Sequence, residues 1–287
     1  MTHTFGCVVL TEARRPDHLQ RAMESVLVQR GVDVDLVVVG NGAKPEDLPD
    51  GARVLALPEN LGIPAGRNAG IPEATGDLLL FLDDDAYLKG DDFLSRAAEM
   101  FDRDPTLGVV QPRVLDPAGV RTPRRFVPRL RVGDDRRSSD VVALWEGVCV
   151  VRRSALDKAG AWPDEFFYMH EGVDLTWRVM DAGYRVRYCG DLEAFHPAVD
   201  PERHPELHYF GARNRVWLAR RNLPIPLAVP YLVTWALIDT LRLRNLRSAR
   251  QQVRGFFDGV RKPCGTRSPI SWRTTWRMTR AGRPPVI

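Results

Sequence analysis

The stretch from Leu78 to Ala86, LLLFLDDDA, constrains the fold of this chain more than any other. Its apolar run is typical of a strand buried on both faces of a sheet, and three carboxylates follow it directly. Burying adjacent carboxylates unpaired costs several kcal/mol, so a cation is expected beside them. Side chains alternate in extended backbone, so Asp83 and Asp85 can share one divalent metal ion while Asp84 faces elsewhere. A solvated acidic turn is the alternative.

The segments before this strand alternate as in a parallel sheet. Apolar runs at 5–10, 34–39 and 54–57 predict strands, and the apolar spacing at 19–27 predicts a helix. Polar or glycine-rich turns follow these runs, where ligand-binding loops lie in an open α/β sheet. In the glycine- and alanine-rich segment 60–70, small residues let the backbone approach a ligand and an arginine suits a phosphate. The alternation predicts an α/β fold.

The middle of the chain is less regular. A helix is predicted after Asp91, and a strand around 109–110 should stop at Pro112. The segment 117–139, rich in Pro and Arg, is predicted to be a long mobile loop, either a lid over the site or a surface insertion. Extended structure resumes over 141–153, and the glycine within it, Gly147, indicates a close approach by ligand or backbone.

Two later segments carry polar residues that suit a catalytic site. An amphipathic helix is predicted near 171–182, and Glu171 and Asp174 stand near its start, where the helix dipole favours anions. The alternative is a pair of capping acids. His196 ends a further extended piece; a lone histidine is commonly structural, but an imidazole beside carboxylates is a reasonable third metal ligand.

Cysteine usage and the first residues bear on the compartment. The four cysteines are far apart and form no CxxC pair, which predicts neither a disulfide framework nor a zinc site. A reducing compartment fits best. The sequence MTHTFGCVVLTEARR lacks the basic region and long apolar stretch of a signal peptide, so a cytoplasmic location is expected.

The charge of the chain is unevenly distributed. Residues 200–287 hold 17 Lys and Arg against 5 Asp and Glu, a balance of +12, although the whole chain carries only +4. No zinc finger, helix-turn-helix signal or aromatic RNA-binding strand is present, so nucleic acid is not expected as a partner. A phospholipid surface or a phosphate-bearing substrate suits the basic part better.

An apolar segment opens this basic tail. Residues 225–241 are largely apolar but broken by prolines, and they are too few for a spanning helix, which needs about 20 apolar residues. The arginines that follow are Arg242, Arg244, Arg247, Arg250 and Arg254. An apolar helix beside an arginine cluster predicts contact with an anionic membrane surface on the inner face of the plasma membrane. An apolar interface between subunits, as in a homodimer, is the alternative, and no element is assigned after Pro263.

The motifs taken in order resemble inverting nucleotide-sugar glycosyltransferases of family 2, which have the GT-A fold. The matching pieces, over about 5–222, are the turn Thr11–Arg14, GNG, NLGIPAGRNAGI, FLDDDA, WEGVCVVRRSAL, FFYMHEGVDLTWR and His196. The chain is most similar to the branch that handles rhamnosyl, galactofuranosyl and related sugars. The resemblance implies a Rossmann-like mixed sheet flanked by helices. It divides domain 1–222 into a nucleotide-sugar half at about 1–112 and an acceptor half at 140–222, followed by a basic helical extension at 223–287.

The resemblance also implies roles for individual residues. Asp83, Asp85 and His196 match positions that hold Mg²⁺ or Mn²⁺ on the donor diphosphate. Matches on the nucleotide-sugar side are Thr11, Glu12, Arg14, Asn41, Asn60, Arg67, Asp83 and Asp84, and those on the acceptor side are Trp145, Gly147, His170, Arg213 and Asn214. The implied reaction moves a sugar from a nucleoside diphosphate-sugar to a hydroxyl of a glycan, a lipid-linked acceptor or a small molecule. A carboxylate takes the proton, and single displacement inverts the configuration.

Three departures from the family pattern affect these implications. VGNGA replaces the usual VDNGS, so Gly40 stands where an aspartate commonly meets the base, and Glu12 and Ala13 replace the usual Tyr-Asn pair. A UDP or dTDP donor is expected first, with guanosine carriers open. EGVDL replaces EDxDL, so Gly172 occupies the usual base position and cannot move a proton. Either Glu171 or Asp174 would then act as the base, with Glu171 preferred.

Two other functions remain in view. A protein that keeps the fold but has lost its base would be a non-catalytic partner, and Gly172 is the main observation in its favour. A sugar nucleotidyltransferase shares a similar nucleotide-binding half. The HEGVDLTWR segment and His196 favour glycosyl transfer over nucleotidyl transfer.

Overall fold

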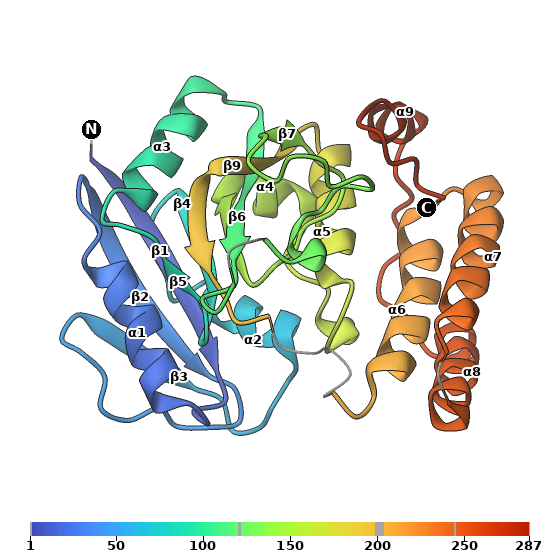
Figure 1. Cartoon of the computed structure of the whole chain (residues 1–287), viewed down its shortest axis with the longest axis horizontal. Coiled ribbons are helices and arrows are strands. Elements are labelled where there is room, and N and C mark those ends of the chain that lie inside the picture. The colour runs from blue at the N-terminus through green and yellow to red at the C-terminus, as the bar shows by residue number, and fades with distance from the viewer. Residues whose placement is uncertain (1, 120–121, 199–203, 244, 287) are drawn as a thin grey trace.

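The computed structural model describes residues 2–119, 122–198, 204–243 and 245–286, so Arg244 of the predicted arginine cluster lies outside the described residues. A mixed sheet forms the centre of the molecule, and helices cover both of its faces (Figure 1). The strand order is β3-β2-β1-β4-β8-β6-β9-β5, with β7 paired to β9. The predicted α/β class is confirmed.

The strands follow the predicted apolar runs closely in the first part of the chain and less closely in the middle. Their bounds are β1 His3–Thr11, β2 Val32–Gly40, β3 Ala52–Ala56, β4 Leu78–Asp83, β5 Tyr87–Leu88, β6 Leu107–Leu115, β7 Ser139–Asp140, β8 Val148–Arg152 and β9 Arg185–Phe195. The expected stop at Pro112 is wrong, because β6 continues past it and pairs with β9 through a register shift between Pro112 and Arg113. A bulge tolerates the missing proline N–H. Extended structure over the whole of 141–153 is also wrong, since β8 begins only at Val148.

The helices divide into those that cover the sheet and those that form a layer at one end of it. Their bounds are α1 Pro16–Leu27, α2 Ile63–Gly70, α3 Phe93–Arg103, α4 Arg153–Ala159, α5 Glu171–Asp181, α6 Leu207–Asn222, α7 Ile225–Leu241, α8 Leu246–Arg261 and α9 Trp272–Arg280, with 3₁₀ turns at Arg124–Phe126 and Asp164–Phe166. Figure 1 shows α6 to α9 together on the right of the molecule, beyond α5. The helix α9 lies in the part that the sequence left unassigned.

Alternating side chains of the central strands pack into two separate hydrophobic cores, one on each face of the sheet. In β4, Leu79 and Phe81 join the core that also holds residues of α4, α5 and α6, while Leu78 and Leu80 join the core beneath α1 and α3. Both faces of the strand are therefore buried, which is why its sequence is continuously apolar.

One edge of the sheet gathers the ends of several strands. β1, β2 and β4 are parallel, with Leu10 opposite Asp83 and Thr11 opposite Gly40. The antiparallel β8 begins opposite Leu82, so the turn before it reaches the same edge. β9 runs parallel to β6 and ends there as well. This edge is where an open α/β sheet places its ligand.

The end layer is held by a close contact between two helices. A Cβ at Gly259 of α8 would lie 2.7 Å from Cβ of Val216 in α6, and one at Gly255 would meet the carbonyl of Tyr209. Glycines spaced four apart thus let α8 lie directly on α6. Across the described ranges, no helix combines the length and the apolar character needed to cross a bilayer.

Candidate active site

The acidic end of β4 meets the end of β9. Asp83, Asp85 and His196 each place one potential metal-ligand atom, a carboxylate oxygen or an imidazole nitrogen, within 4.8 Å of the other two. Nε2 of His196 is 3.0 Å from Oδ1 of Asp85 and 4.0 Å from Oδ2 of Asp83. Residues predicted from two separate motifs therefore converge on one point, although 110 positions of sequence lie between the acidic run and His196.

The middle carboxylate faces a different set of partners. Oδ2 of Asp84 accepts a hydrogen bond of 2.7 Å from the Thr11 hydroxyl, and Oδ1 accepts one of 2.6 Å from Nη2 of Arg15. Nη1 of Arg15 also contacts Asp85. Burial raises the pKa of Asp84, while Thr11 and Arg15 act in the opposite direction. Arg15 was not predicted as a site residue, although its place in the polar turn after β1 was a signal for it.

An aromatic wall orients His196. Nδ1 of His196 lies 2.7 Å from the Pro197 carbonyl oxygen. The His196 ring is edge-on to the rings of Trp145 and Phe126, with centroid-to-centroid distances of 4.9 and 5.4 Å. Phe126 is buried and belongs to the predicted loop 117–139, so this loop contributes to the site wall. A Cβ at Gly147 would lie 2.8 Å from Oδ2 of Asp83 and would also meet the Trp145 ring. The space beside Gly147 is thus filled by the side chains of Trp145 and Asp83, whereas a ligand or backbone was expected there.

The carboxylate oxygens of Asp83 and Asp85 and the imidazole nitrogen of His196 suit a hard divalent cation as ligands. With Nδ1 donating to the Pro197 carbonyl, Nε2 of His196 faces the two carboxylates and would offer its lone pair to a metal ion bound there, as in many metal-bound histidines. Burial alone would raise the pKa of Asp85, but His196 and Arg15 outweigh it and lower the pKa to about 2. An ionised carboxylate beside an imidazole suits Mg²⁺ or Mn²⁺ and does not separate the two.

The loops after β2 and β3 form the other wall. Nδ2 of Asn41 donates to Oδ1 of Asn60 at 2.9 Å and to the Gly62 carbonyl at 3.1 Å. Asn60 also contacts Glu12, which ties this turn to the turn after β1. A Cβ at Gly40 would lie 2.5 Å from Cδ of Pro45 and would meet the carbonyl of Ala43. The aspartate that the family usually has at this position therefore has no room here.

These walls enclose a cleft of 720 Å³. The predicted residues that line it are Thr11, Glu12, Arg14, Asn41, Asn60, Arg67, Asp83, Asp84, Asp85, Trp145, Gly147, His170, Glu171 and His196. Lining residues that the sequence reasoning missed include Arg15, Arg125, Phe126, Glu146 and Tyr168. Glu146 lies in the WEG motif directly before Gly147, and that position was its only sequence signal.

Comparison with known proteins places this geometry in a family. The sequence profile of glycosyl transferase family 2 matches residues 7–160, more than half of the chain. The chain belongs to glycosyl transferase family 2. Over 201 residues it is 30% identical to the pre-mycofactocin glycosyltransferase of Mycobacterium tuberculosis, a match that covers 65% of this chain and 41% of that protein. The chain thus spans less than half the length of this curated relative.

Solved structures share the architecture of this family 2 chain. TarS of S. aureus, residues 1–349, superposes with a TM-score of 0.61 at 18% identity, over 91% of this chain and 81% of that one. The mannosyltransferase PcManGT of Pyrobaculum calidifontis, solved with GDP-Man and Mn²⁺, gives a TM-score of 0.55 at 16% identity, over 98% and 85%. At these identities the likeness concerns the fold, which is GT-A as the sequence predicted.

Three predicted residues of this family 2 chain lie outside the cleft lining. Asp174 is fully buried and accepts hydrogen bonds from Nε of Arg178, Nε of Arg221 and Nδ2 of Asn222, at 2.7, 3.0 and 2.6 Å. It joins α5 to α6. Arg213 and Asn214 donate to backbone carbonyls of 166–169, the segment whose side chains line the cleft. These two residues therefore support the cleft wall from behind.

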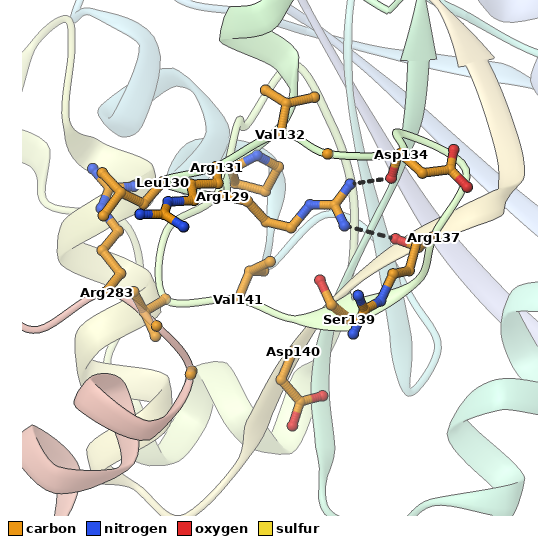
Figure 2. Close-up of a pocket in the computed structure, with 15 residues that line it drawn as sticks. Arg129, Leu130, Arg131, Val132, Asp134, Arg137, Ser139, Asp140, Val141 and Arg283 are labelled. Carbon is orange, nitrogen blue, oxygen red and sulfur yellow. Dashed lines mark hydrogen bonds between the residues drawn. The ribbon is translucent and has the colours of Figure 1, made fainter.

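A second cavity, of 610 Å³, lies between the loop 128–142 and residues 281–283 (Figure 2). Arginines surround it, but Arg129 donates to the carbonyls of Asp134 and Arg137 at 2.7 and 3.1 Å, as the dashed lines in Figure 2 mark. The Arg129 guanidinium therefore stabilises the loop to which Arg129 itself belongs. None of the predicted site residues lines this cavity.

Proposed function

We propose that this protein is a metal-dependent, inverting glycosyltransferase that moves a sugar from a nucleoside diphosphate-sugar to a hydroxyl acceptor. The observation that carries the proposal is the convergence of Asp83, Asp85 and His196 in a cleft that also holds carboxylates able to take a proton. A divalent cation on these three residues would neutralise the charge that develops on the leaving diphosphate. Membership in glycosyl transferase family 2 supports the same reaction class.

The residues of the cleft divide the work in this proposal. Arg15 and Arg67 are fixed cations beside the acidic strand end and can bind phosphate oxygens. Thr11, Asn41 and Asn60 shape the nucleotide side, and Trp145 and His170 face the acceptor side. Single displacement at the anomeric carbon needs the acceptor oxygen and the leaving phosphate oxygen on opposite faces of the sugar.

The donor base is a narrower proposal. Because Gly40 leaves no room for the usual aspartate, the base must be recognised by other groups of this wall, such as Glu12 and Asn60. UDP- and dTDP-sugars are proposed first, and GDP-sugars belong in the same test since PcManGT was solved with GDP-Man. The acceptor is proposed to be a glycan, a lipid-linked molecule or a small hydroxyl compound.

The test is release of nucleoside diphosphate from a panel of UDP-, dTDP- and GDP-sugars, with Mn²⁺, with Mg²⁺ and with EDTA. We expect one donor to be cleaved slowly, only with metal, and not by Asp85→Ala. Metal-dependent binding of a nucleotide without cleavage would support the donor site and indicate strict acceptor dependence. No binding of any nucleotide would overturn the proposal and favour a non-catalytic protein.

We also propose that the end layer rests on an anionic membrane surface. Twelve of the 16 large apolar side chains that are strongly exposed in the described residues lie between Ile225 and Trp276. In α7, an exposed row at four-residue spacing consists of Ile225, Val229, Val233, Leu237 and Leu241. The arginines of α8 and the exposed Trp272 and Trp276 of α9 supply the charges and aromatic rings that favour a bilayer interface. This would place the protein on the cytoplasmic face of the membrane.

A further inference from the structure

The glycine at the usual base position leaves space that another side chain fills. A Cβ built on Gly172 would lie 2.8 Å from Oε2 of Glu146 and 2.8 Å from the carbonyl of Leu144. A side chain at position 172 would therefore occupy the place where the Glu146 carboxylate now lies. Glu146 reaches this place from the turn before β8, whereas Gly172 belongs to the first turn of α5. The carboxyl group lost from the helix is thus replaced in space by one from the sheet edge.

Glu146 is paired with the other carboxyl group at this point. The side chains of Glu146 and Glu171 interact directly here, and because adjacent ionised carboxylates repel each other, the pair favours holding one proton. Among the described residues, Oε2 of Glu171 meets no hydrogen-bond partner. Glu171 is 2% exposed, while Glu146 is half-buried and lines the cleft. Burial and the neighbouring Glu146 raise the pKa of Glu171 well above its usual range. Glu171 is therefore the carboxyl group of the pair that favours its protonated form.

A buried cation links this pair to the acidic end of β4. Arg67 donates to Asp83. Burial raises the pKa values of both Glu146 and Glu171, and the charge of Arg67 acts against this rise. Within the described residues, Nε and Nη1 of Arg67 meet no hydrogen-bond acceptor. The accessible carboxylate of Glu146 is thus held in the same cleft as the metal ligands, with a cation nearby that favours its ionised form.

We propose that Glu146 is the catalytic base of this protein and that Glu171 is a positioning residue that holds it by a hydrogen bond. This inference rests on the proposed glycosyl transfer. The acceptor oxygen forms a bond to the anomeric carbon, and its proton passes to a carboxylate oxygen of Glu146. The bond from the anomeric carbon to the diphosphate breaks, and the diphosphate leaves with the electron pair. The proposal moves the expected base role from Glu171 to its partner, and it explains why Gly172 does not imply a dead enzyme.

The matched pair Glu146→Gln and Glu171→Gln separates the two roles. With the donor that the wild type cleaves, Glu146→Gln is expected to lower kcat by about 10²- to 10⁴-fold, the usual contribution of a general base. Glu171→Gln keeps an N–H that can donate to Glu146, so its loss should stay within about 10-fold, as for one neutral hydrogen bond. Both variants should bind the Mn²⁺ complex of the nucleoside diphosphate as the wild type does, which also reports that they fold.

A second measurement distinguishes a base from a structural residue. Azide is already an anion and needs no base, so Glu146→Ala with sodium azide should release nucleoside diphosphate and form a glycosyl azide of inverted configuration. The azide nitrogen bonds to the anomeric carbon as the phosphate oxygen leaves, and no proton moves. Glu171→Ala should gain no comparable azide dependence.

The outcomes separate this inference from the function on which it rests. If the wild type cleaves the donor and Glu146→Gln cleaves it equally well, or if Glu171→Gln shows the large loss instead, Glu146 is not the base and the glycosyltransferase proposal stands. A Glu146→Ala variant that binds nucleotide but is not rescued by azide would also overturn the assignment. A wild type that neither binds nucleotides nor cleaves donors overturns both proposals.

Discussion

Arg67 donates a hydrogen bond of 2.8 Å from Nη2 to Oδ1 of Asp83, and its side chain is only 1% exposed. A guanidinium this deeply buried is stable only beside carboxylates that compensate its charge, and those carboxylates in turn depend on its positive charge. The guanidinium carbon also lies over the ring of Trp162, 5.0 Å from the ring centroid. Arg67 is therefore the positive charge that the buried Glu171 and the half-buried Asp83 and Glu146 share.

Removing this charge should destabilise the fold. Arg67→Met keeps much of the volume but leaves a cluster of carboxyl groups without a cation, and we expect a loss of about 3–5 kcal/mol in the free energy of unfolding. Arg67→Lys keeps the charge without the fork and should lose less. Urea unfolding without metal measures both. Equal stability of wild type and Arg67→Met would show that the buried ion pair with Asp83 is not needed.

Filling the space at Gly172 should disturb the neighbouring carboxylate. The methyl group of Gly172→Ala would press on Glu146 and on the Leu144 carbonyl, and such overpacking costs about 1–3 kcal/mol. Turnover should fall because Glu146 moves, while affinity for nucleoside diphosphate and Mn²⁺ should not change. Gly211→Ala is the matched control, since its nearest neighbour would be 3.8 Å away. A Gly172→Ala variant with wild-type turnover would contradict the arrangement.

The raised pKa of Glu171 predicts a pH dependence of stability. Between the pKa of an unfolded glutamate, about 4.3, and the higher folded value, the folded state holds a proton that the unfolded state has lost. The stabilisation is complete below the unfolded pKa and is lost as pH rises through the folded pKa, by up to about 1.4 kcal/mol per pH unit. Glu171→Gln lacks this titration. Its stability relative to the wild type should therefore increase from pH 5 to pH 8, and a constant difference in urea unfolding would show that Glu171 titrates normally.

Asp174 should matter for stability more than for chemistry. Asp174→Asn leaves Arg178 and Arg221 without their shared carboxylate at the contact between α5 and α6, so we expect a loss of about 3–5 kcal/mol. Turnover per folded molecule at low temperature should stay close to that of the wild type. A variant that is fully stable but inactive would instead favour Asp174 as the base.

The exposed row of α7 predicts binding to anionic vesicles. The protein should sediment with phosphatidylcholine vesicles that contain phosphatidylglycerol, less so without the anionic lipid and less so at high salt. Leu237→Glu should weaken this binding, whereas Val28→Glu, an exposed apolar position on the opposite part of the chain, should not. A stable homodimer in light scattering, with no vesicle binding, would assign this face to a subunit interface.

The fold and the acidic site were largely predictable because they follow from local patterns. A continuous apolar run fixes β4 as a central strand, and parallel strands necessarily bring their carboxyl ends to one edge. Thr11, Asn41 and Asp83 therefore had to be neighbours. Pro112 misled the prediction because a bulge, which leaves no local pattern, lets β6 continue.

The base region was harder to predict because it depends on packing between distant segments. Glu171 and Asp174 are one helical turn apart, but only the position of α6 turns Asp174 into an ion pair with Arg221. Glu146 is 26 positions before Gly172, and nothing in the two motifs says that one side chain fills the space that the other lacks. Gly172 could be recognised from the sequence, but only the structure shows that Glu146 occupies the space beside it.

Single displacement on a nucleotide-sugar inverts the anomeric configuration, and proton NMR of the reaction detects that inversion. Wild type, Mn²⁺ and the donor identified in the panel are mixed, and the anomeric proton of the first sugar product is followed before it mutarotates. We predict metal-dependent loss of the donor signal and a product of the opposite anomeric configuration. A product with the configuration of the donor, or cleavage that persists in EDTA and in Asp85→Ala, would contradict it.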